Sequence, residues 1–234
     1  MGPGGLSMDW TRAVNAYCER TDAAFWSEPV NAITNAAFLI AAVLVWPMTR
    51  GDPGARALAV VLGVIGIGSF LFHTFAQVWA GLADVLPILA FILLYTGLAT
   101  RRFLGAPVWA ALLAAALYVP FSSVVSGLVE RAVGSLNGSA SYLPVVVLIG
   151  AYALALARRA PETARGLAIG VAILALSLTF RTIDSRVCGA FPLGTHFLWH
   201  VLNAVMLGWM IRVYVRHRTP LRPGAGLARG TGAG

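Results

Sequence analysis

Residues 57–77 read ALAVVLGVIGIGSFLFHTFAQ and contain no Asp, Glu, Lys or Arg. A helix needs about 20 apolar residues to cross the hydrocarbon core of a bilayer, so this stretch predicts a transmembrane helix. The whole chain agrees, because 59% of its 234 residues are hydrophobic and only 11% are charged. Soluble domains are about 45–50% apolar. The composition therefore predicts an integral membrane protein.

Six further apolar stretches have similar length, and we expect all seven to form helices. They lie at residues 30–48, 83–100, 107–127, 140–157, 164–181 and 195–215. The stretch at 107–127 is the weakest, because Pro120, Ser122 and Ser123 interrupt it. The predicted fold is all-α, a bundle of seven transmembrane helices in one membrane domain over residues 17–216. We expect residues 1–16 to be flexible and the Gly-, Pro- and Arg-rich tail at 217–234 to be disordered.

The arginines predict how the bundle is oriented in the membrane. All basic residues are Arg, and most fall in alternate loops and the C-terminal tail: Arg50, Arg56, Arg101, Arg102, Arg158, Arg159, Arg165, Arg212, Arg216, Arg218, Arg222 and Arg229. The opposite side holds Arg12, Arg20, Arg131, Arg181 and Arg186. The positive-inside rule then places the N-terminus outside and the C-terminus in the cytoplasm.

The net charge of +8 is thus a signal of topology. Nucleic-acid binding would require a basic patch on a soluble face, which this pattern does not offer. The N-terminal residues do not follow the usual signal-peptide pattern. The lack of Lys, with abundant Ala, Gly and Arg, indicates a GC-rich bacterial genome and hence a bacterial inner membrane.

Polar residues gather at the predicted outer ends of four helices. These residues are Ser69, His73, Asp84, Asp184, His196 and His200. An ionisable group inside a membrane helix costs about 2.5–3.5 kcal/mol on the mildest scale, and such groups usually face a functional site within the bundle. We therefore expect a site near the periplasmic side.

Three histidines in one layer indicate a metal. His196 and His200 lie four residues apart, on one face of a helix. A single membrane His is more often a hydrogen-bonded packing residue, but three of the four His fall in this cluster. Three imidazoles and a water are a known arrangement of catalytic zinc, so His73, His196 and His200 are the predicted zinc ligands. His217 sits among arginines, where a solvated or headgroup role is expected.

Ser69 and Asp84 each allow more than one interpretation. Ser69 lies four residues before His73 and could approach a metal-bound group, or could hydrogen-bond to its own helix. Asp84 could accept a proton, orient a His, or cap the N-terminus of its helix. Its place in the histidine layer favours chemistry.

Several stretches resemble the alkaline ceramidase family of seven-helix membrane zinc hydrolases. They are AYCERTDAAFWSEPVNAITN at 16–35, GSFLFH at 68–73 followed by DVLP at 84–87, and GTHFLWHVLNA at 194–204. The resemblance implies a zinc-dependent amidase that cleaves the N-acyl bond of ceramide to a fatty acid and a sphingoid base. It implies that Asp84 activates the water, that Ser69 lies beside the developing oxyanion, and that Trp199 lines the substrate pocket.

The resemblance also implies a calcium ion bound by the N-terminal segment. Glu19 and Glu28 match its acidic ligands, and Tyr17 would offer a backbone carbonyl. Ala16 replaces the first acidic ligand, so Asp22 or Asn31 would have to compensate. A solvated acidic loop is the alternative.

The two cysteines, Cys18 and Cys188, are both predicted on the outer face. An oxidising location allows a disulfide, which the resemblance also implies. Two free thiols, or a Cys ligand to zinc, are the alternatives.

Two other functions remain open at this point. One is hydrolysis of another lipid amide or ester by the same site. The other is a receptor-like or transporter-like protein without hydrolysis, although the inner halves of the helices are nearly bare of the ionisable groups that a proton relay needs. The expected partner is a ceramide-like membrane lipid. The sequence does not select the acyl chain or the oligomeric state.

Overall fold

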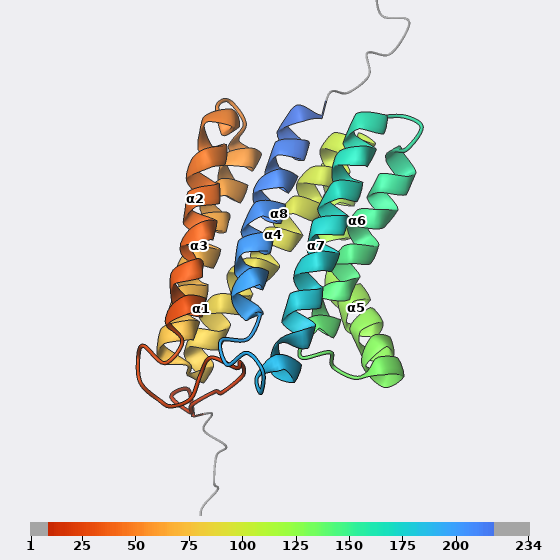
Figure 1. Ribbon diagram of the computed structural model, residues 1–234. Helices are drawn as coiled ribbons and strands as arrows, with labels where there is room; N and C mark the ends of the chain where they lie inside the picture. The colour runs from red at the N-terminus through yellow and green to blue at the C-terminus, as the bar shows by residue number, and fades with distance from the viewer. Residues whose placement is uncertain (1–8, 218–234) are drawn as a thin grey trace, which may run out of the picture.

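The computed structural model describes residues 9–217, and seven helical spans in this range are long and apolar enough to cross a membrane. They form one bundle (Figure 1). This confirms the predicted all-helical, seven-span fold. The expected flexible and disordered ends fall mainly on residues 1–8 and 218–234, which lie outside the described part of the chain.

Two of the spans are composite and five are single helices. The first span consists of α1 (Pro29–Thr34), α2 (Ala36–Val45) and the 3-10 helix η1 (Trp46–Thr49). The fifth consists of the 3-10 helix η2 (Ser139–Tyr142) and α6 (Leu143–Leu156). The others are α3 (Pro53–Phe75), α4 (Val78–Leu104), α5 (Val108–Val133), α7 (Pro161–Val187) and α8 (His196–Arg216).

The starts of these helices follow the sequence. Pro29, Pro53 and Pro161 each stand in the first turn of a helix. The fixed φ of Pro suits that position, and its missing N–H would have no partner there in any residue. The Asp52 side chain also accepts a hydrogen bond from the Ala55 N–H at 3.0 Å, so α3 begins with an N-cap.

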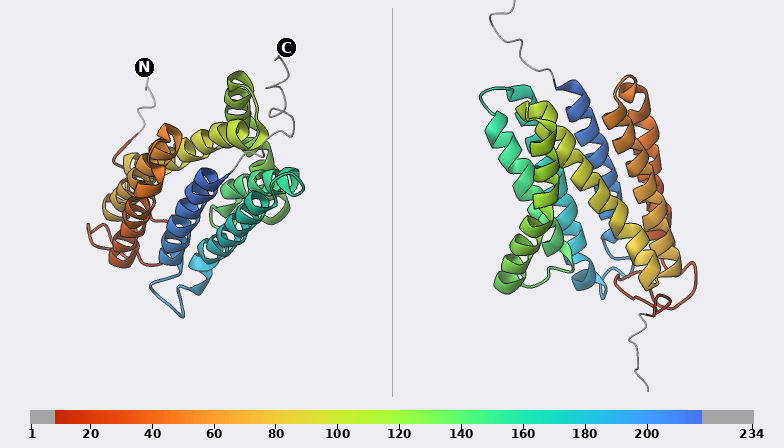
Figure 2. Two further views of the ribbon diagram at one scale, coloured as in Figure 1. Left: turned by 90° about the horizontal axis from the view of Figure 1, so that it is seen from above. Right: turned by 180° about the vertical axis from the view of Figure 1, so that it is seen from behind.

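The interrupted stretch near Pro120 is nevertheless one helix. α5 is 26 residues long and continues past Pro120 without a break. Its second half leans away from the bundle (Figure 2). A backbone that faces lipid has no water to bond, so the helix is kept even where Pro removes one hydrogen bond.

Large apolar side chains cover the outside of the bundle. Leu44, Leu112 and Leu154 are 69%, 65% and 80% exposed, and many other Leu, Ile and Val side chains resemble them. A soluble protein rarely exposes so continuous an apolar surface. This surface fits the hydrocarbon of a bilayer.

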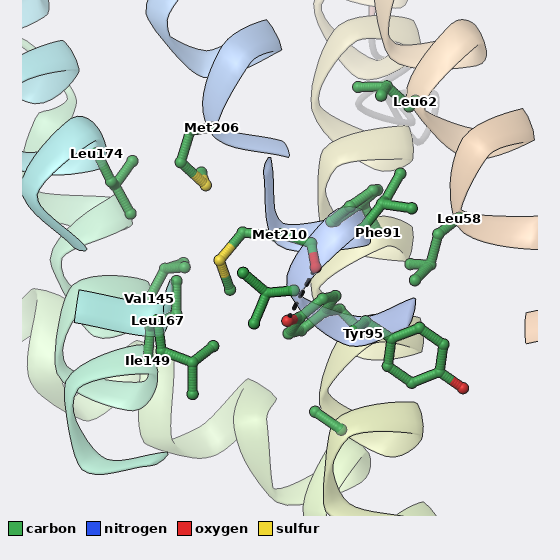
Figure 3. Packing of buried hydrophobic residues seen from close by; sticks show 14 of the residues in the cluster. Leu58, Leu62, Phe91, Tyr95, Val145, Ile149, Leu167, Leu174, Met206 and Met210 are labelled. Carbon is green, nitrogen blue, oxygen red and sulfur yellow. Dashed lines mark hydrogen bonds between the residues drawn. The ribbon is translucent and has the colours of Figure 1, made fainter. Parts of the chain in front are cut away.

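The centre of the bundle is α8, which packs against α2, α3 and α7 (Figure 2). Its Met206 and Met210 meet a core formed by side chains from α3, α4, α6 and α7 (Figure 3). Inside this core the Tyr95 hydroxyl donates a hydrogen bond to the carbonyl of Met210 at 3.3 Å. A buried phenol finds its partner here in a helix backbone.

The N-terminal segment closes the end of the bundle at which α8 begins (Figure 1). The Val14 N–H donates to the carbonyl of Ala76 at 2.7 Å, and the Val78 N–H donates to the carbonyl of Arg12 at 3.2 Å. A disulfide joins Cys18 to Cys188, with 5.3 Å between their Cα atoms. The disulfide that the sequence predicted is therefore confirmed. It fastens the segment to the end of α7.

Candidate metal centre

Two helices bring the three predicted histidines together. His73 lies in the last turn of α3, and His196 and His200 lie in the first two turns of α8. The ring centroid of His73 lies 5.2 Å from that of His196 and 4.6 Å from that of His200. The ring centroids of the two α8 histidines are 4.6 Å apart. One nitrogen from each lies within 4.8 Å of the others. Each residue is only 1% exposed.

One nitrogen on each ring lacks a hydrogen-bond partner within residues 9–217. These atoms are Nε2 of His73, Nδ1 of His196 and Nε2 of His200, and all three are buried. A buried polar atom left unpaired costs about 1–3 kcal/mol. Three such atoms in one cluster are better explained by a shared partner, and neutral imidazole nitrogens are ligands that zinc prefers. The donor set therefore fits a metal ion.

The opposite nitrogens of two rings are held by oxygen atoms. His73 Nδ1 lies 2.6 Å from Oε2 of Glu28, and His200 Nδ1 lies 3.0 Å from the hydroxyl of Thr34. The Thr34 hydroxyl donates to the carbonyl of Val30 at 2.8 Å, so its oxygen can accept a hydrogen bond from the ring. Both Nδ1 atoms then carry hydrogen. Both Nε2 atoms keep a free lone pair toward the cluster.

His196 is fixed in a different way. Its ring stacks on Tyr17, with 3.5 Å between the ring centroids. Its backbone N–H donates to Asp184 at 2.9 Å, and the Thr195 N–H donates to the same carboxylate oxygen at 2.7 Å. The other oxygen of Asp184 accepts from the Cys18 N–H at 3.1 Å. Asp184 thus anchors the start of α8 and Cys18 of the disulfide through backbone N–H groups.

Asp84 does not cap its helix. α4 begins at Val78 with Gln77 in the N-cap position, five residues earlier than the sequence predicted, so Asp84 lies in the second turn. Its electrostatic neighbours are His73, Ser69 and Arg181. The capping interpretation is therefore excluded. Asp84 faces the interior of the bundle beside the histidine cluster.

Ser69 reaches Asp84 because α3 and α4 are in backbone contact. Gly68 lies against the backbone of Ala83, and a Cβ on Gly68 would overlap the Ala83 carbonyl. The next residue on each helix is Ser69 and Asp84. The contact therefore brings the hydroxyl and the carboxyl into one pocket.

That pocket lies in the apolar core and has a cavity volume of about 40 Å³. Ser69, Asp84 and Trp199 line its polar end. The rest of its wall is apolar apart from Tyr142 and Asn203: Phe38, Ile65, Ile88, Phe91, Ile92, Val145, Leu174, Met206 and Leu207. From Asp84 to Ile92 the wall follows α4 for about 12 Å. The pocket is therefore lined mainly by apolar side chains, with polar groups at one end.

The acidic residues of the N-terminal segment have partners within the chain. The two Glu19 carboxylate oxygens accept from the N–H groups of Val30 and Asn31 at 2.7 and 2.8 Å. Asp22 is exposed and accepts from the Ala24 N–H at 2.9 Å. The backbone carbonyl of Tyr17 accepts from the Arg20 N–H at 3.3 Å. Each of these groups therefore already accepts a hydrogen bond from within the chain.

Glu28 pairs with both Arg20 and His73. Burial raises the pKa of Glu28, but the hydrogen bonds from His73 and Arg20 outweigh burial and hold the pKa below its ordinary value. Asn31 keeps one buried oxygen, Oδ1, without a partner in the described chain. Calcium takes six to eight oxygen ligands. The residues present do not fit the expected calcium ion.

Sequence reasoning missed several residues around the cluster. Thr34 carried no recognised signal, Arg20 was used only for topology, and Glu28 was assigned to calcium only. Arg181 was used only for topology, but its guanidinium donates to the Tyr17 hydroxyl at 3.0 Å and lies 5.1 Å from the Trp199 ring. These contacts join positions far apart in the chain, so no local pattern reveals them.

His217 lies at the other end of α8, apart from the cluster. Its ring is 2.8 Å from the Thr163 hydroxyl and 4.8 Å from the ring of Phe103. Partial burial and the positive charge of Arg102 lower the pKa of His217.

Seven apolar spans around three buried imidazoles define a membrane protein with a candidate metal centre. A family model described as Ceramidase matches residues 12–221. The chain belongs to the ceramidase family, which is a family of hydrolases. A comparison with curated proteins finds no match to this chain.

Proposed function

We propose that this protein is a zinc-dependent amidase that hydrolyses the N-acyl bond of ceramide or a ceramide-like lipid. One observation carries the proposal: three unpaired imidazole nitrogens converge beside a carboxyl and a hydroxyl, at the polar end of an apolar pocket. Membership of the ceramidase family supports a lipid substrate.

The metal ligands would be Nε2 of His73, Nδ1 of His196 and Nε2 of His200. Zinc in a three-histidine site acts as a Lewis acid and lowers the pKa of a bound water to about 7. Glu28 and Thr34 keep two of the rings in the tautomer that offers a lone pair to the ion.

Asp84 is the proposed general base. Its carboxyl accepts a proton from the attacking water, whose oxygen bonds to the amide carbonyl carbon. When the C–N bond breaks, Asp84 returns that proton to the leaving amine. The Ser69 hydroxyl donates a hydrogen bond to the carbonyl oxygen as negative charge develops on it. A fatty acid and an amine are the products, and Asp84 ends as a carboxylate again.

The pocket would bind the acyl chain. Its wall runs inward from Asp84 along α4 and from Trp199 along α8, so the amide stays at the polar end while the chain lies among apolar side chains. Burial of apolar surface contributes about 25 cal/mol per Å². The chain would thereby fix the carbonyl beside Asp84.

The arginine distribution supports an orientation with the N-terminus outside and the C-terminus in the cytoplasm. In a bacterial inner membrane this orientation would put the histidine cluster near the periplasmic side. The disulfide is consistent with an oxidising compartment on that side.

The proposal is tested by lipid hydrolysis with the purified protein in detergent. The protein is stripped of metal with a chelator, and zinc is then restored before N-acyl sphingoid bases, N-acyl ethanolamines and ester lipids are supplied in parallel. We expect zinc-dependent release of fatty acid from the N-acyl sphingoid base above all. Hydrolysis of only the ester lipids, or equal rates without zinc, would contradict the proposal.

A further inference from the structure

The guanidinium of Arg20 contacts two of the residues that the resemblance implied as calcium ligands, the carboxylate of Glu28 and the backbone of Asp22. Its Nε donates to the Glu28 carboxylate. One terminal nitrogen donates to the carbonyls of Asp22 and Ala24 at 3.1 and 3.4 Å, and the other donates to the carbonyl of His73 at 2.9 Å. Arg20 is 6% exposed and Glu28 is 2% exposed. Three carbonyl oxygens and one carboxylate oxygen therefore surround a buried positive charge.

This set of oxygens is the kind that binds a hard divalent cation. Every one of them already accepts a hydrogen bond from Arg20, and the guanidinium fills the space between them. A second cation there would be repelled by the first, and it would have to displace a side chain whose charge needs these partners. The arrangement leaves no place for calcium at this point.

The same guanidinium acts on the end of α3. The last carbonyls of a helix have no partner within the helix, and positive charge near them is favourable. Arg20 donates to the His73 carbonyl, which is one of them, while its partner Glu28 holds the ring of His73. Arg20 therefore contacts the backbone of His73 directly and acts on its ring indirectly, through Glu28.

We propose that Arg20 is a built-in cation that replaces calcium in this protein and, through Glu28, positions His73 as a metal ligand. The positioning role rests on the proposed metal centre. The replacement of calcium does not.

The first test uses the wild-type protein. After dialysis against a calcium chelator, equilibrium dialysis with radioactive calcium and thermal unfolding with and without added calcium are measured. We expect no stoichiometric calcium and the same Tm in both buffers. A calcium ion bound by each chain, with a rise in Tm, would overturn the proposal.

The second test measures zinc affinity by competition with a chelator in calcium-free buffer. Arg20→Ala should weaken zinc binding by about 10–100-fold, the usual effect of losing a group that orients a ligand. Arg20→Lys should also weaken it, because a point charge cannot reach all four acceptors in the fixed fork geometry of Arg. Zinc affinity equal to wild type in both variants would overturn the positioning role.

Arg12→Ala is the matched control, because Arg12 lies in the same segment and is exposed. It should leave zinc affinity unchanged, and a loss as large as that of Arg20→Ala would overturn the specific role of Arg20. None of these measurements uses lipid hydrolysis. A failure of this proposal is therefore distinguishable from a failure of the proposed amidase activity.

Discussion

Each imidazole of the cluster has one nitrogen for the proposed metal and must be held by its other contacts. For His200 the holding group is Thr34, and for His73 it is Glu28. His196 relies on the Tyr17 ring and on the anchored start of α8. Three different devices therefore orient three similar ligands.

Thr34→Val tests the first of these devices. Val has nearly the same shape but no hydroxyl, so His200 Nδ1 loses its acceptor and the ring is free to change tautomer. Zinc affinity, measured by chelator competition, should fall by about 10–100-fold. Thr179→Val is the control, because Thr179 is exposed on α7 and bonds only to its own helix. Unchanged zinc affinity in Thr34→Val would contradict the account.

Asp84→Asn separates proton transfer from packing. Asn has the same size and keeps hydrogen bonds, but it cannot accept the proton of water. General base catalysis contributes about 10²–10⁴-fold, so kcat should fall by at least about a hundredfold. Zinc content should change little, because Asp84 is not among the proposed ligands. Turnover near that of the wild type would remove Asp84 from the mechanism.

The histidines were predictable because ionisable groups are rare in membrane helices and because topology alone brings helix ends to one layer. The partners of those histidines were not. Glu28 is 45 residues from His73, and Thr34 is 166 residues from His200. Thr and Glu are also common near helix starts for other reasons. Only the packed structure assigns them to the rings.

At the scale of helices, the close approach of α3 and α4 determines the pocket. Gly68→Ala would place a methyl group on the Ala83 carbonyl and force the helices apart. Overpacking of this kind costs about 1–3 kcal/mol, and a misplacement of about 1 Å can slow a reaction about 10²-fold. We therefore expect a lower Tm and slower lipid hydrolysis.

Gly63→Ala is the matched control on the same helix. The nearest atom to a Cβ at this position would be 3.8 Å away, which is an ordinary contact. It should leave both Tm and hydrolysis near the wild-type values. If Gly68→Ala behaved like this control, the backbone contact would not be what positions Ser69 and Asp84.

The helices themselves were more predictable than their ends. Apolar length identified all seven spans, since a single segment can satisfy its own backbone hydrogen bonds in lipid only as a helix. The sequence predicted the start of α4 five residues too late. Residues 78–82 continue the helix into a region covered by the N-terminal segment, where a change from apolar to polar residues no longer marks the membrane boundary. The span at 107–127, the weakest in the sequence because of Pro120, is confirmed as one helix. The differences between predicted and observed helix ends arise from packing and solvent exposure, which the order of residues along the chain does not specify.

For the whole molecule, the arginines predict orientation. Epitope tags at the two termini should be probed with protease on intact spheroplasts and again after lysis. We expect the N-terminal tag to be cleaved in intact spheroplasts and the C-terminal tag only after lysis. The reverse result would overturn the orientation and, with it, the placement of the site on the periplasmic side.

The metal content of the purified protein tests the central claim most directly. Elemental analysis of the wild type should find about one zinc ion per chain. His73→Ala, His196→Ala and His200→Ala should each lose most of that zinc while remaining folded and membrane-inserted, because each removes one of only three protein ligands. Full zinc content in any of the three variants, or a wild-type protein that binds no zinc, would contradict the account.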